Sequence, residues 1–429
     1  MAATLLLVSS AVLLFIGVPI GVALAVAMLV TNMAFPVTTA GFVAQSMFSG
    51  LNSFPLLAIP GFMIAGSIME TGGLSKRLVK LANTLVGNSP GGLGTVTVLA
   101  CMFFGAVSGS APATVAAIGT IMIPEMVKHG YDKVYATALV AAAGGLGIIV
   151  PPSIPMVVYG CTNNVSVGSL FMAGFGPALV VGVGLMIVNW IIAKKKGYRG
   201  SGEATGIKAV GRAFWDAKWA LLMPAIILGG IYGGVFTPTE AAIVSLFYGL
   251  IIGLFVYKEL SWREFLVALK NNTSLVGGIM LTFAPASALG AMLSLMGVPA
   301  RITSAMLSFT SSPGVVLFLI LVFLLLVGMV MTTSPAIIIF SPMLLTIVKA
   351  FGMSPVQFGI IMTVSLAIGF VTPPVALNLF VASGMTGLEV GAIAKKATPF
   401  IVALFVAMAI ITYVPGISIG LLRLVGASL

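Results

Sequence analysis

Residues 108–115 read SGSAPATV, and residues 331–338 read MTTSPAII. Both stretches place hydroxyl side chains and a proline inside an apolar segment, where they would normally weaken a helix. A proline lacks the amide hydrogen and leaves the carbonyl group one turn earlier without its helical partner. Pro112 and Pro335 are 223 residues apart, so the chain offers free backbone carbonyl groups at two related places.

The composition around these breaks is that of an integral membrane protein. The chain has 429 residues, a mean hydropathy of +1.21 and only 7% charged residues, which excludes a soluble domain with a polar surface. Because the apolar runs are continuous and do not alternate with polar residues, they predict helices and not a closed barrel. Runs long enough to cross a bilayer core of about 30 Å occur at about 4–30, 54–73, 134–160, 169–193, 217–257, 274–296, 315–331, 355–383 and 398–422.

Other sequence features narrow the class further. The first run has no basic leader and no small-residue cleavage site, so we expect it to remain as a membrane helix. The two cysteines, Cys101 and Cys161, are too few for a disulfide framework. The net charge of +11 lies in short loops between apolar runs, which indicates membrane topology and not nucleic-acid binding. No G-x-x-x-x-G-K-[ST] motif occurs, so the chain is not expected to hydrolyse ATP.

The basic residues sort to one side of the membrane if the amino terminus is cytoplasmic. Of the 20 lysines and arginines, only Arg301, Lys349 and Arg423 then lie outside, as the positive-inside rule expects. This sorting requires residues 91–127 and 313–348 each to enter and leave the membrane on the same side, as re-entrant hairpins. We therefore expect nine spans and two hairpins, the first hairpin opening to the cytoplasm and the second to the outside.

Matching motifs indicate an internal repeat. GIIVPPS (147–153) matches GFVTPPV (369–375) at nearly the offset of the two hairpin prolines. The loop at 161–168 has no charged residue whereas 385–398 contains a lysine pair, so we expect the halves to be inverted. Inverted repeats with broken helices are typical of secondary transporters, which bind solute near the midplane. We predict an all-α membrane fold with two broken helices (about 134–160 and 355–383), a first repeat at 1–193, a basic arm and connecting span at 194–236, and a second repeat at 237–429.

The breaks point to bound sodium. Na⁺ prefers oxygen ligands, and unwound backbone surrounded by protein can supply neutral carbonyl oxygens inside a membrane. Each hairpin tip is expected to face the broken helix of its own half and to enclose one ion. The first sodium site is predicted at Ser108, Ser110, Gly147, Val150 and Pro152, and the second at Thr332, Thr333, Gly369, Thr372 and Pro374.

The space between the tips is expected to bind the solute. Helix ends direct partial positive charge toward it, which suits an anion. The alternative interpretation is that SGSA is a small-residue packing seam and that the double prolines are kinks. Candidate solute ligands are Ser110, Pro112, Ser153, Asn163, Thr333, Ser334 and Asn378.

The acidic residues favour sodium over protons as the coupling ion, because they lie at span ends or in loops and not at mid-membrane. Thr237, Pro238 and Glu240 are instead interpreted as the N-cap, first-turn proline and capping-box partner of a helix. The remaining acidic residues at span ends or in loops are Glu70, Glu125, Asp132, Glu203, Asp216, Glu259, Glu264 and Glu389.

Four motifs resemble the large membrane (M) subunit of TRAP (tripartite ATP-independent periplasmic) transporters over essentially the whole chain. They are SGSAPATVAAIG (108–119), GIIVPPSIPMVVYG (147–160), GGVFTPTEAA (233–242) and GFVTPPVALNLFV (369–381). The resemblance implies a multi-pass bacterial inner-membrane carrier that is driven by a Na⁺ gradient through an elevator motion, with sodium at the residues named above. Position 331 is Met where the first tip has Ser108, so the two sodium sites should differ.

The resemblance also implies partners and a class of solute. The partners are a small four-helix membrane subunit (Q) and a soluble periplasmic substrate-binding protein (P). Because the chain begins directly at its first span, the small subunit is expected to be a separate polypeptide. The expected solute is an anionic organic acid, sialic acid (N-acetylneuraminate) first and a C4-dicarboxylate next, and Na⁺ is the expected ion with no organic cofactor.

Two further expectations concern mechanism. The basic, Trp-bearing stretches 194–219 and 257–265 predict interfacial arms that hold a scaffold in place. A channel or passive facilitator for small anions is the alternative function. An intramembrane enzyme is disfavoured, and no catalytic residue is expected, because the spans contain no serine with a membrane histidine, no aspartate pair and no metal cluster.

Overall fold

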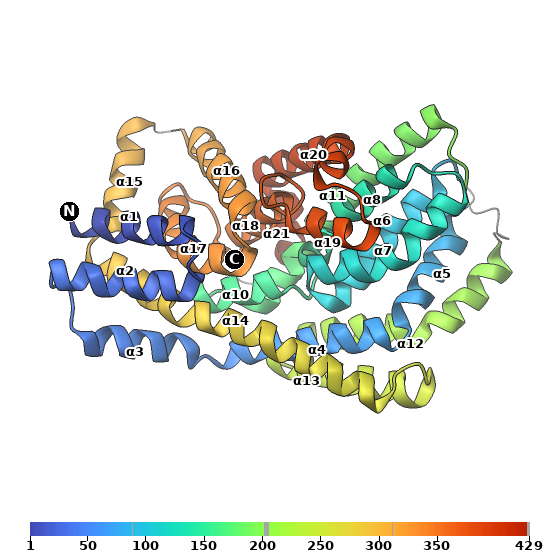
Figure 1. The fold of residues 1–429 in the computed structure, drawn as a ribbon, viewed down its shortest axis with the longest axis horizontal. Coiled ribbons are helices and arrows are strands. Elements are labelled where there is room, and N and C mark those ends of the chain that lie inside the picture. The colour runs from blue at the N-terminus through green and yellow to red at the C-terminus, as the bar shows by residue number, and fades with distance from the viewer. Residues whose placement is uncertain (88, 201–205, 311, 427–429) are drawn as a thin grey trace.

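The computed structural model describes residues 1–429 except 88, 201–205, 311 and 427–429 (Figure 1). Within these residues the chain is helical and contains no strand, as the continuous apolar runs predict. Nine of the described helical segments are long and apolar enough to cross a membrane. This count includes both arms of the second hairpin and omits the first apolar run, so it is not the set of nine spans expected from the sequence.

The helices fall into two similar series. The first half contains α1 (Ala2–Phe15), α2 (Ile20–Ala34), α3 (Ala40–Leu51), η1 (Phe54–Leu57), α4 (Ala58–Thr71), α5 (Leu74–Val86), α6 (Gly92–Ser108), α7 (Ala111–Lys128), α8 (Lys133–Ala143), α9 (Leu146–Ile149), α10 (Ile154–Asn163) and α11 (Val167–Lys196). The second half contains α12 (Ile207–Tyr232), α13 (Pro238–Ile251), η2 (Ile252–Val256), α14 (Trp262–Leu295), α15 (Val298–Phe309), α16 (Pro313–Val330), α17 (Thr333–Ala350), α18 (Pro355–Gly369), α19 (Leu377–Thr386), α20 (Val390–Tyr413) and α21 (Pro415–Val425).

The first apolar run is not one span, and the prediction of a single helix over about 4–30 is wrong. It forms two short antiparallel helices, α1 and α2, which pack against each other. Gly17 has a φ of +88°, and Pro19 has no amide hydrogen, so the helix cannot continue between them. The amino terminus therefore lies at the end of the molecule opposite α5 and the start of α12 (Figure 1), and not beside the basic loops as we supposed.

The later loops remain on the sides of the membrane that their basic residues predict. Because α1 and α2 are antiparallel, together they return the chain to the side on which it began, so only the predicted side of the amino terminus changes. The connecting span predicted within 194–236 corresponds largely to α12, which ends at Tyr232 and packs on α13 as α1 packs on α2. The final run is likewise interrupted, since α20 ends at Tyr413 and Pro415 begins α21.

Each half contains a helical hairpin and a broken helix. Helices α6 and α7 pack as the first hairpin and turn at Gly109-Ser110, and α16 and α17 form the second, with the turn at Met331-Thr332. The first broken helix runs through α8, α9 and α10, and its Pro151-Pro152 break is buried. The second runs through α18 and α19 with its break at Pro373-Pro374. Both Pro-Pro peptide bonds are cis.

The two inverted repeats are interlocked. Helix α10 of the first half packs on α17 of the second, and α19 of the second packs on α7 of the first. Polar contacts join the same elements: the Asn163 side-chain amide donates to Ser341 Oγ at 2.6 Å, and the Tyr159 hydroxyl donates to the Pro355 carbonyl at 2.8 Å. Each half therefore supplies the packing partners of the other, and the hairpins and broken helices form one body.

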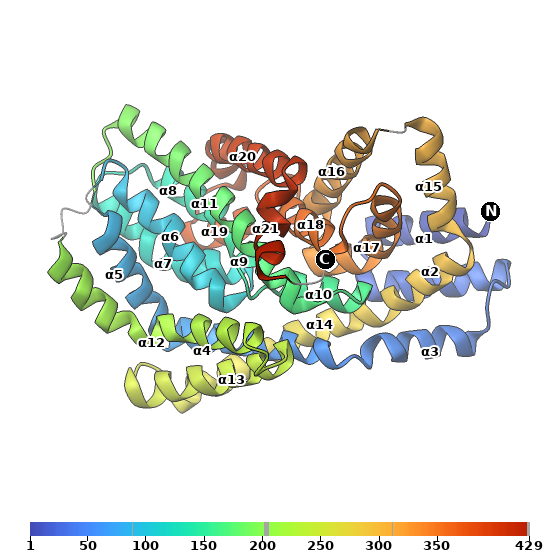
Figure 2. The ribbon, with the colours of Figure 1, turned by 180° about the vertical axis from the view of Figure 1, so that it is seen from behind.

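A layer of long helices lies along one side of this body. Helices α4, α13 and α14 run together along the lower edge in Figure 1 and, seen from behind, in Figure 2. Their pairing is reciprocal, because α13 packs on α4 of the first half while α2 packs on α14 of the second. We call α2, α4, α13 and α14 the scaffold. Helix α13 begins with the predicted capping box, in which Thr237 and Glu240 bond each other's backbone amides.

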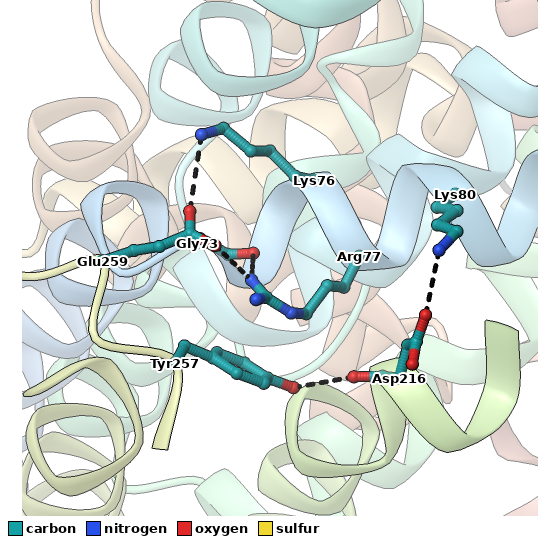
Figure 3. Close-up of polar contacts among 7 residues, drawn as sticks. All are labelled: Gly73, Lys76, Arg77, Lys80, Asp216, Tyr257 and Glu259. Carbon is teal, nitrogen blue, oxygen red and sulfur yellow. Dashed lines mark hydrogen bonds and ion pairs between the residues drawn. The ribbon is translucent and has the colours of Figure 1, made fainter. Parts of the chain in front are cut away.

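One end of the scaffold, which we call the basic end, is held by ion pairs among α5, α12 and the loop before α14 (Figure 3). Arg77 donates to Glu259 at 2.7 Å, and its guanidinium carbon lies 3.6 Å from the centre of the Tyr257 ring. Lys80 pairs with Asp216 at 2.9 Å, and the Tyr257 hydroxyl donates to the Asp216 carbonyl at 3.1 Å. These contacts involve the stretches predicted as interfacial arms, apart from residues 201–205, which lie outside the described part.

Candidate functional site

The tip of the first hairpin gathers three oxygen atoms. The hydroxyl oxygens of Ser108 and Thr114 are 3.1 Å apart, and Thr114 donates to the Ser110 carbonyl at 2.8 Å. The Ser108 hydroxyl lies 3.4 Å from the same carbonyl. Oxygen ligands at right angles around Ca²⁺, an ion of similar radius to Na⁺, are about 3.3–3.7 Å apart. The three oxygens therefore need little movement to share a cation.

The first tip also contacts the broken helix that the sequence assigned to it. Gly109 turns the chain with a φ of +60°, and its carbonyl accepts a hydrogen bond from the Ile154 amide at 3.3 Å. A Cβ atom at Gly109 would lie 3.0 Å from the Pro152 carbonyl oxygen. Gly147 faces the tip directly, because a Cβ atom there would lie 2.6 Å from the Ser110 carbonyl oxygen. Ser108, Ser110, Gly147 and Pro152 are thus brought together, and buried Val150 lies in the same break.

Thr114 belongs to this cluster, although the sequence analysis did not select it. It lies on α7 one turn after Ser110 and is fully buried. The spacing of four residues after the hairpin tip was the available signal, since residues i and i+4 share one face of a helix. A threonine in an apolar helix also commonly bonds its own backbone, so the sequence did not separate the two roles.

The second tip is built differently. The Val375 amide donates to the Met329 carbonyl at 3.0 Å, which joins the tip to its broken helix as Ile154 does in the first half. Gly369 packs directly on the backbone of Gly328. The Thr372 hydroxyl donates back to the Ile368 carbonyl at 2.9 Å. Among the described residues, no side-chain hydrogen bond joins the hydroxyl groups at this tip, Thr332, Thr333 and Ser334.

Burial also differs between the two breaks. Pro151 and Pro152 are buried, whereas Pro373 and Pro374 are exposed and Thr372 is half-buried. The second site is therefore more open than the first, and it offers hydroxyl groups that are not already bonded to one another.

Both tips line one cavity of about 690 Å³, which we call the central cavity. The first turns of four helices reach it: Ala111 of α7, Ile154 of α10, Thr333 of α17 and Leu377 of α19. The amino-terminal end of a helix carries partial positive charge and free amide hydrogens. The wall of the cavity next to the body therefore favours a negatively charged group. Of the predicted solute residues, Ser110, Pro112, Thr333 and Ser334 line this cavity, as does Thr332.

Three other predicted solute residues lie elsewhere. Ser153 is buried, and its hydroxyl donates to the Ile148 carbonyl at 2.6 Å. Asn163 bonds Ser341 across the repeat interface, as described above. Asn378 is buried, and its side-chain amide donates to the Ala141 carbonyl at 3.1 Å, while its Oδ1 has no hydrogen-bond partner in the described protein. None of these three side chains is among the described residues that line the central cavity.

The charged residues are sparse around the cavity. Glu70, which we expected simply at a span end, lies in the last turn of α4 and lines the central cavity. In the part of the chain that the structure describes, no group of three or more His, Cys, Asp or Glu residues is placed to hold a metal ion. At the first tip the clustered oxygen atoms belong to carbonyl and hydroxyl groups, a donor set that suits Na⁺ better than a transition metal. Glu203 lies outside the described residues.

Comparison with known proteins identifies similar sequences along nearly the whole chain. Residues 7–417 match the family profile "Tripartite ATP-independent periplasmic transporter, DctM component". The isethionate TRAP transporter permease protein DctMQ of Oleidesulfovibrio alaskensis is 46% identical over 95% of this chain, and the chain spans 64% of its length. The C4-dicarboxylate TRAP transporter large permease protein DctM of Pseudomonas aeruginosa is 40% identical over 90% of each chain.

A solved structure shares the fold. The YdaH transporter of Alcanivorax borkumensis is 16% identical and superposes with a TM-score of 0.65 over 88% of each chain. At this identity the likeness concerns the architecture alone.

Proposed function

This chain belongs to the TRAP transporter family as its large membrane subunit, the DctM component, and we propose that it takes up an anionic organic acid with Na⁺. As a member of this family it is a multi-pass inner-membrane permease and not an enzyme. Family membership leaves open the coupling ion, the solute and the movement that carries the solute across the membrane.

The observation that carries the proposal is the central cavity with four helix amino termini at its wall. Such ends stabilise anions through amide hydrogens and the helix dipole, without a lysine or arginine. Among the described lining residues there is no basic side chain. A carrier that binds an anion with neutral groups can release it again, because the solute is not held by a full opposite charge.

Sodium coupling is supported by the oxygen cluster at the first tip. We propose that Ser108, Ser110 and Thr114 bind one Na⁺ together with carbonyl groups of the break at Gly147, Val150 and Pro152. The second ion is proposed at Thr332, Thr333, Gly369, Thr372 and Pro374. Each ion would fasten a tip to its broken helix and so complete the wall of the cavity before the solute binds.

An elevator movement is supported by the seam between the body and the scaffold. A Cβ atom at Gly66 of α4 would lie 2.9 Å from the Cα atom of Ser108, so the backbones of α4 and the first tip approach closely. Small residues permit this kind of close helix contact in membranes. We propose that the interlocked hairpins and broken helices slide along this seam while the basic end, with its Arg77–Glu259 pair, keeps the scaffold in place.

The partners are proposed from the relatives. A small membrane subunit and a periplasmic binding protein would complete the transporter, as the description of the family implies. The isethionate relative is named DctMQ and is longer than this chain, so whether the small subunit is a separate polypeptide stays a prediction. Several scaffold residues are exposed and apolar, including Ile243, Phe247 and Ile251 of α13, which suits contact with lipid or another membrane helix.

The solute is proposed as a small organic acid. The two relatives described above are named for isethionate and C4-dicarboxylates, and both compounds fit a cavity of about 690 Å³. We therefore place these acids ahead of sialic acid, which was the first expectation from the sequence. All three are candidates for the same assay.

The test is uptake into proteoliposomes that contain the complete membrane complex, with the cognate binding protein outside and an imposed Na⁺ gradient. Uptake of labelled isethionate, succinate or N-acetylneuraminate should require both the gradient and the binding protein. Ser108→Ala, which removes a hydroxyl oxygen of the first site, and Thr333→Ala should each raise the Na⁺ concentration for half-maximal uptake. Uptake that persists without a Na⁺ gradient and without the binding protein would identify a passive facilitator instead.

A further inference from the structure

The central cavity contains one charge that the binding of an anion does not explain. Glu70 is the one formally charged side chain among the described residues that line it, and the other polar lining residues are hydroxyl groups such as Ser67, Ser110 and Thr282. Glu70 is half-buried in α4 and so belongs to the scaffold, not to the body that carries the tips. Its carboxylate shares the cavity with the four helix amino termini and would repel the anion that they attract.

The position of Glu70 identifies the side of the membrane toward which this charge acts. It lies just before Gly72 and Gly73, which lead into α5 with Lys76 and Arg77 at the basic end. The lining residues of α14, between 274 and 282, lie around the middle of that helix and nearer its start at the basic end than the residues of α14 that follow them. The positive-inside rule assigns this end to the cytoplasm.

A second cavity marks the opposite half of the scaffold. It has a volume of about 420 Å³ and is lined by four residues between 49 and 53, by the second half of α14 between 283 and 294, and by residues near the end of α10 and in α17. Among its described lining residues there is none from the first tip (108–112) or the turn of the second (331–335). The tips therefore communicate with the cavity nearer the cytoplasmic end, through which the solute would leave.

We propose that Glu70 is an anion-repelling residue of the release side, which lowers the affinity of the cytoplasm-facing carrier for its solute and so promotes release. This inference rests on the proposed function, because it requires an anionic solute. A residue that carried a coupling proton, or that paired with an ammonium group on the solute, would have to move with the tips. Glu70 is on the scaffold, so under the proposed elevator movement the tips move past it and its charge acts on the solute in one of the two states.

The size of the effect follows from the cavity. A volume of about 690 Å³ corresponds to a sphere about 11 Å across, so a bound anion lies within about 11 Å of the carboxylate, and about 8 Å is a representative separation. Two unit charges at about 8 Å, with an effective dielectric constant of about 40, change a binding constant roughly fivefold. A fixed charge alters the affinity of one state but not the number of ions moved per solute, so the final accumulation of solute should not change.

The experiment compares Glu70→Gln with wild type in proteoliposomes of the complete complex, using whichever of isethionate, succinate or N-acetylneuraminate the wild type transports. Solute loaded inside the vesicles should inhibit uptake at a concentration roughly fivefold lower in Glu70→Gln. Final accumulation and the Na⁺-to-solute ratio should equal those of wild type. Glu389→Gln, which removes an equal charge from an exposed position outside the cavity, should behave as wild type.

A charge-retaining variant and a direct binding measurement distinguish an effect of charge from a loss of folding or of transport. Glu70→Asp retains the charge and should resemble wild type, which separates charge from folding. Calorimetric titration of the purified complex with the same solute measures affinity without transport, and Glu70→Gln should bind roughly fivefold more tightly. Equal affinities in both variants overturn the proposal, as does a changed Na⁺-to-solute ratio or a new dependence on the proton gradient. If the solute binds but Na⁺ does not drive uptake, the proposed function fails while the comparison at Glu70 still stands.

Discussion

Replacement of Gly147 by alanine tests the first sodium site most directly. Gly147 lies in the short helix α9 at the first break, where its Cα atom faces the tip of the hairpin. The added Cβ atom would contact Thr114 Oγ1 and would lie 2.6 Å from the Ser110 carbonyl oxygen. Both oxygens belong to the proposed sodium site, so the substitution changes the site without removing any ligand.

The magnitude follows from the contact distance. Ordinary van der Waals contact begins at about 3.4 Å, so the tip must move away by about 0.8 Å. Binding groups must be held within about 0.5 Å of their productive geometry. Overpacking of a tight site typically costs about 1–3 kcal/mol, and 1.4 kcal/mol is a factor of ten in affinity. We therefore expect Gly147→Ala to raise the half-saturating Na⁺ concentration about tenfold.

The assay is the Na⁺ dependence of initial uptake into proteoliposomes, with the binding protein present at saturation. Gly145→Ala is the matched control, because it lies two residues away in the same buried break and its added Cβ atom would lie no closer than 3.4 Å to any neighbour outside its own helix turn. The control should retain the wild-type Na⁺ dependence. The thermal unfolding temperature of each purified complex shows whether folding is preserved.

Two outcomes would refute the reasoning. One is a Gly147→Ala variant that is folded and has the wild-type Na⁺ half-saturation, because the tip would then not form the site. The other is an equal defect in Gly145→Ala, because the effect would then come from any added methyl group in this break.

Three further predictions address other parts of the molecule. Thr114→Val keeps the shape of the side chain but removes the hydroxyl, so it should weaken Na⁺ activation several-fold while Thr114→Ser does not; equal Na⁺ titrations of the two would argue against this ligand. Gly66→Val should abolish transport but not assembly, because its side chain would collide with Ser108, whereas Gly277→Val has open space and should transport normally. Burial raises the pKa of Glu259, but Arg77 and Lys76 lower it, and the net pKa lies below 4.5. The ion pairs of Glu259 therefore stabilise the fold above about pH 4.5, and this stabilisation is lost as the pH falls through the lowered pKa. Glu259→Gln should therefore lower the melting temperature at pH 7, by the equivalent of about 1 kcal/mol, and its difference from wild type should shrink as the pH is lowered below 4.5; a difference that keeps its full size in acid would contradict this.

The matched breaks were readable from the sequence because proline and glycine act locally. Pro112, Pro335 and the two Pro-Pro pairs interrupt helices wherever they occur, so the positions of both hairpins and both broken helices follow from the chain itself. The charge pattern separated hairpins from spans for the same reason, since each loop reports its own side of the membrane. The capping box at Thr237 and Glu240 is a local signal of the same kind.

Features that depend on distant neighbours were not readable. Thr114 looks like any threonine in an apolar helix until Ser108 and Ser110 are placed beside it. Glu70 was assigned to a span end correctly, but only the packing of α4 against the tips turns that end toward the cavity. The first apolar run was long enough for one span, and its hydropathy alone does not show that Gly17 and Pro19 interrupt the helix.

The interlocking of the two repeats has a consequence for biogenesis. Asn163 emerges from the ribosome 178 residues before its partner Ser341, and Tyr159 emerges 196 residues before Pro355. At a translation rate of about 5–20 residues per second, the partners of these polar groups are synthesised on the order of 10–40 s later. During that time Asn163 can bond only within its own helix, to the Tyr159 carbonyl, and the Tyr159 hydroxyl lacks the acceptor that it has in the folded chain. The early helices therefore stay in the insertion machinery or in lipid without their final polar contacts until α17 and α18 are synthesised.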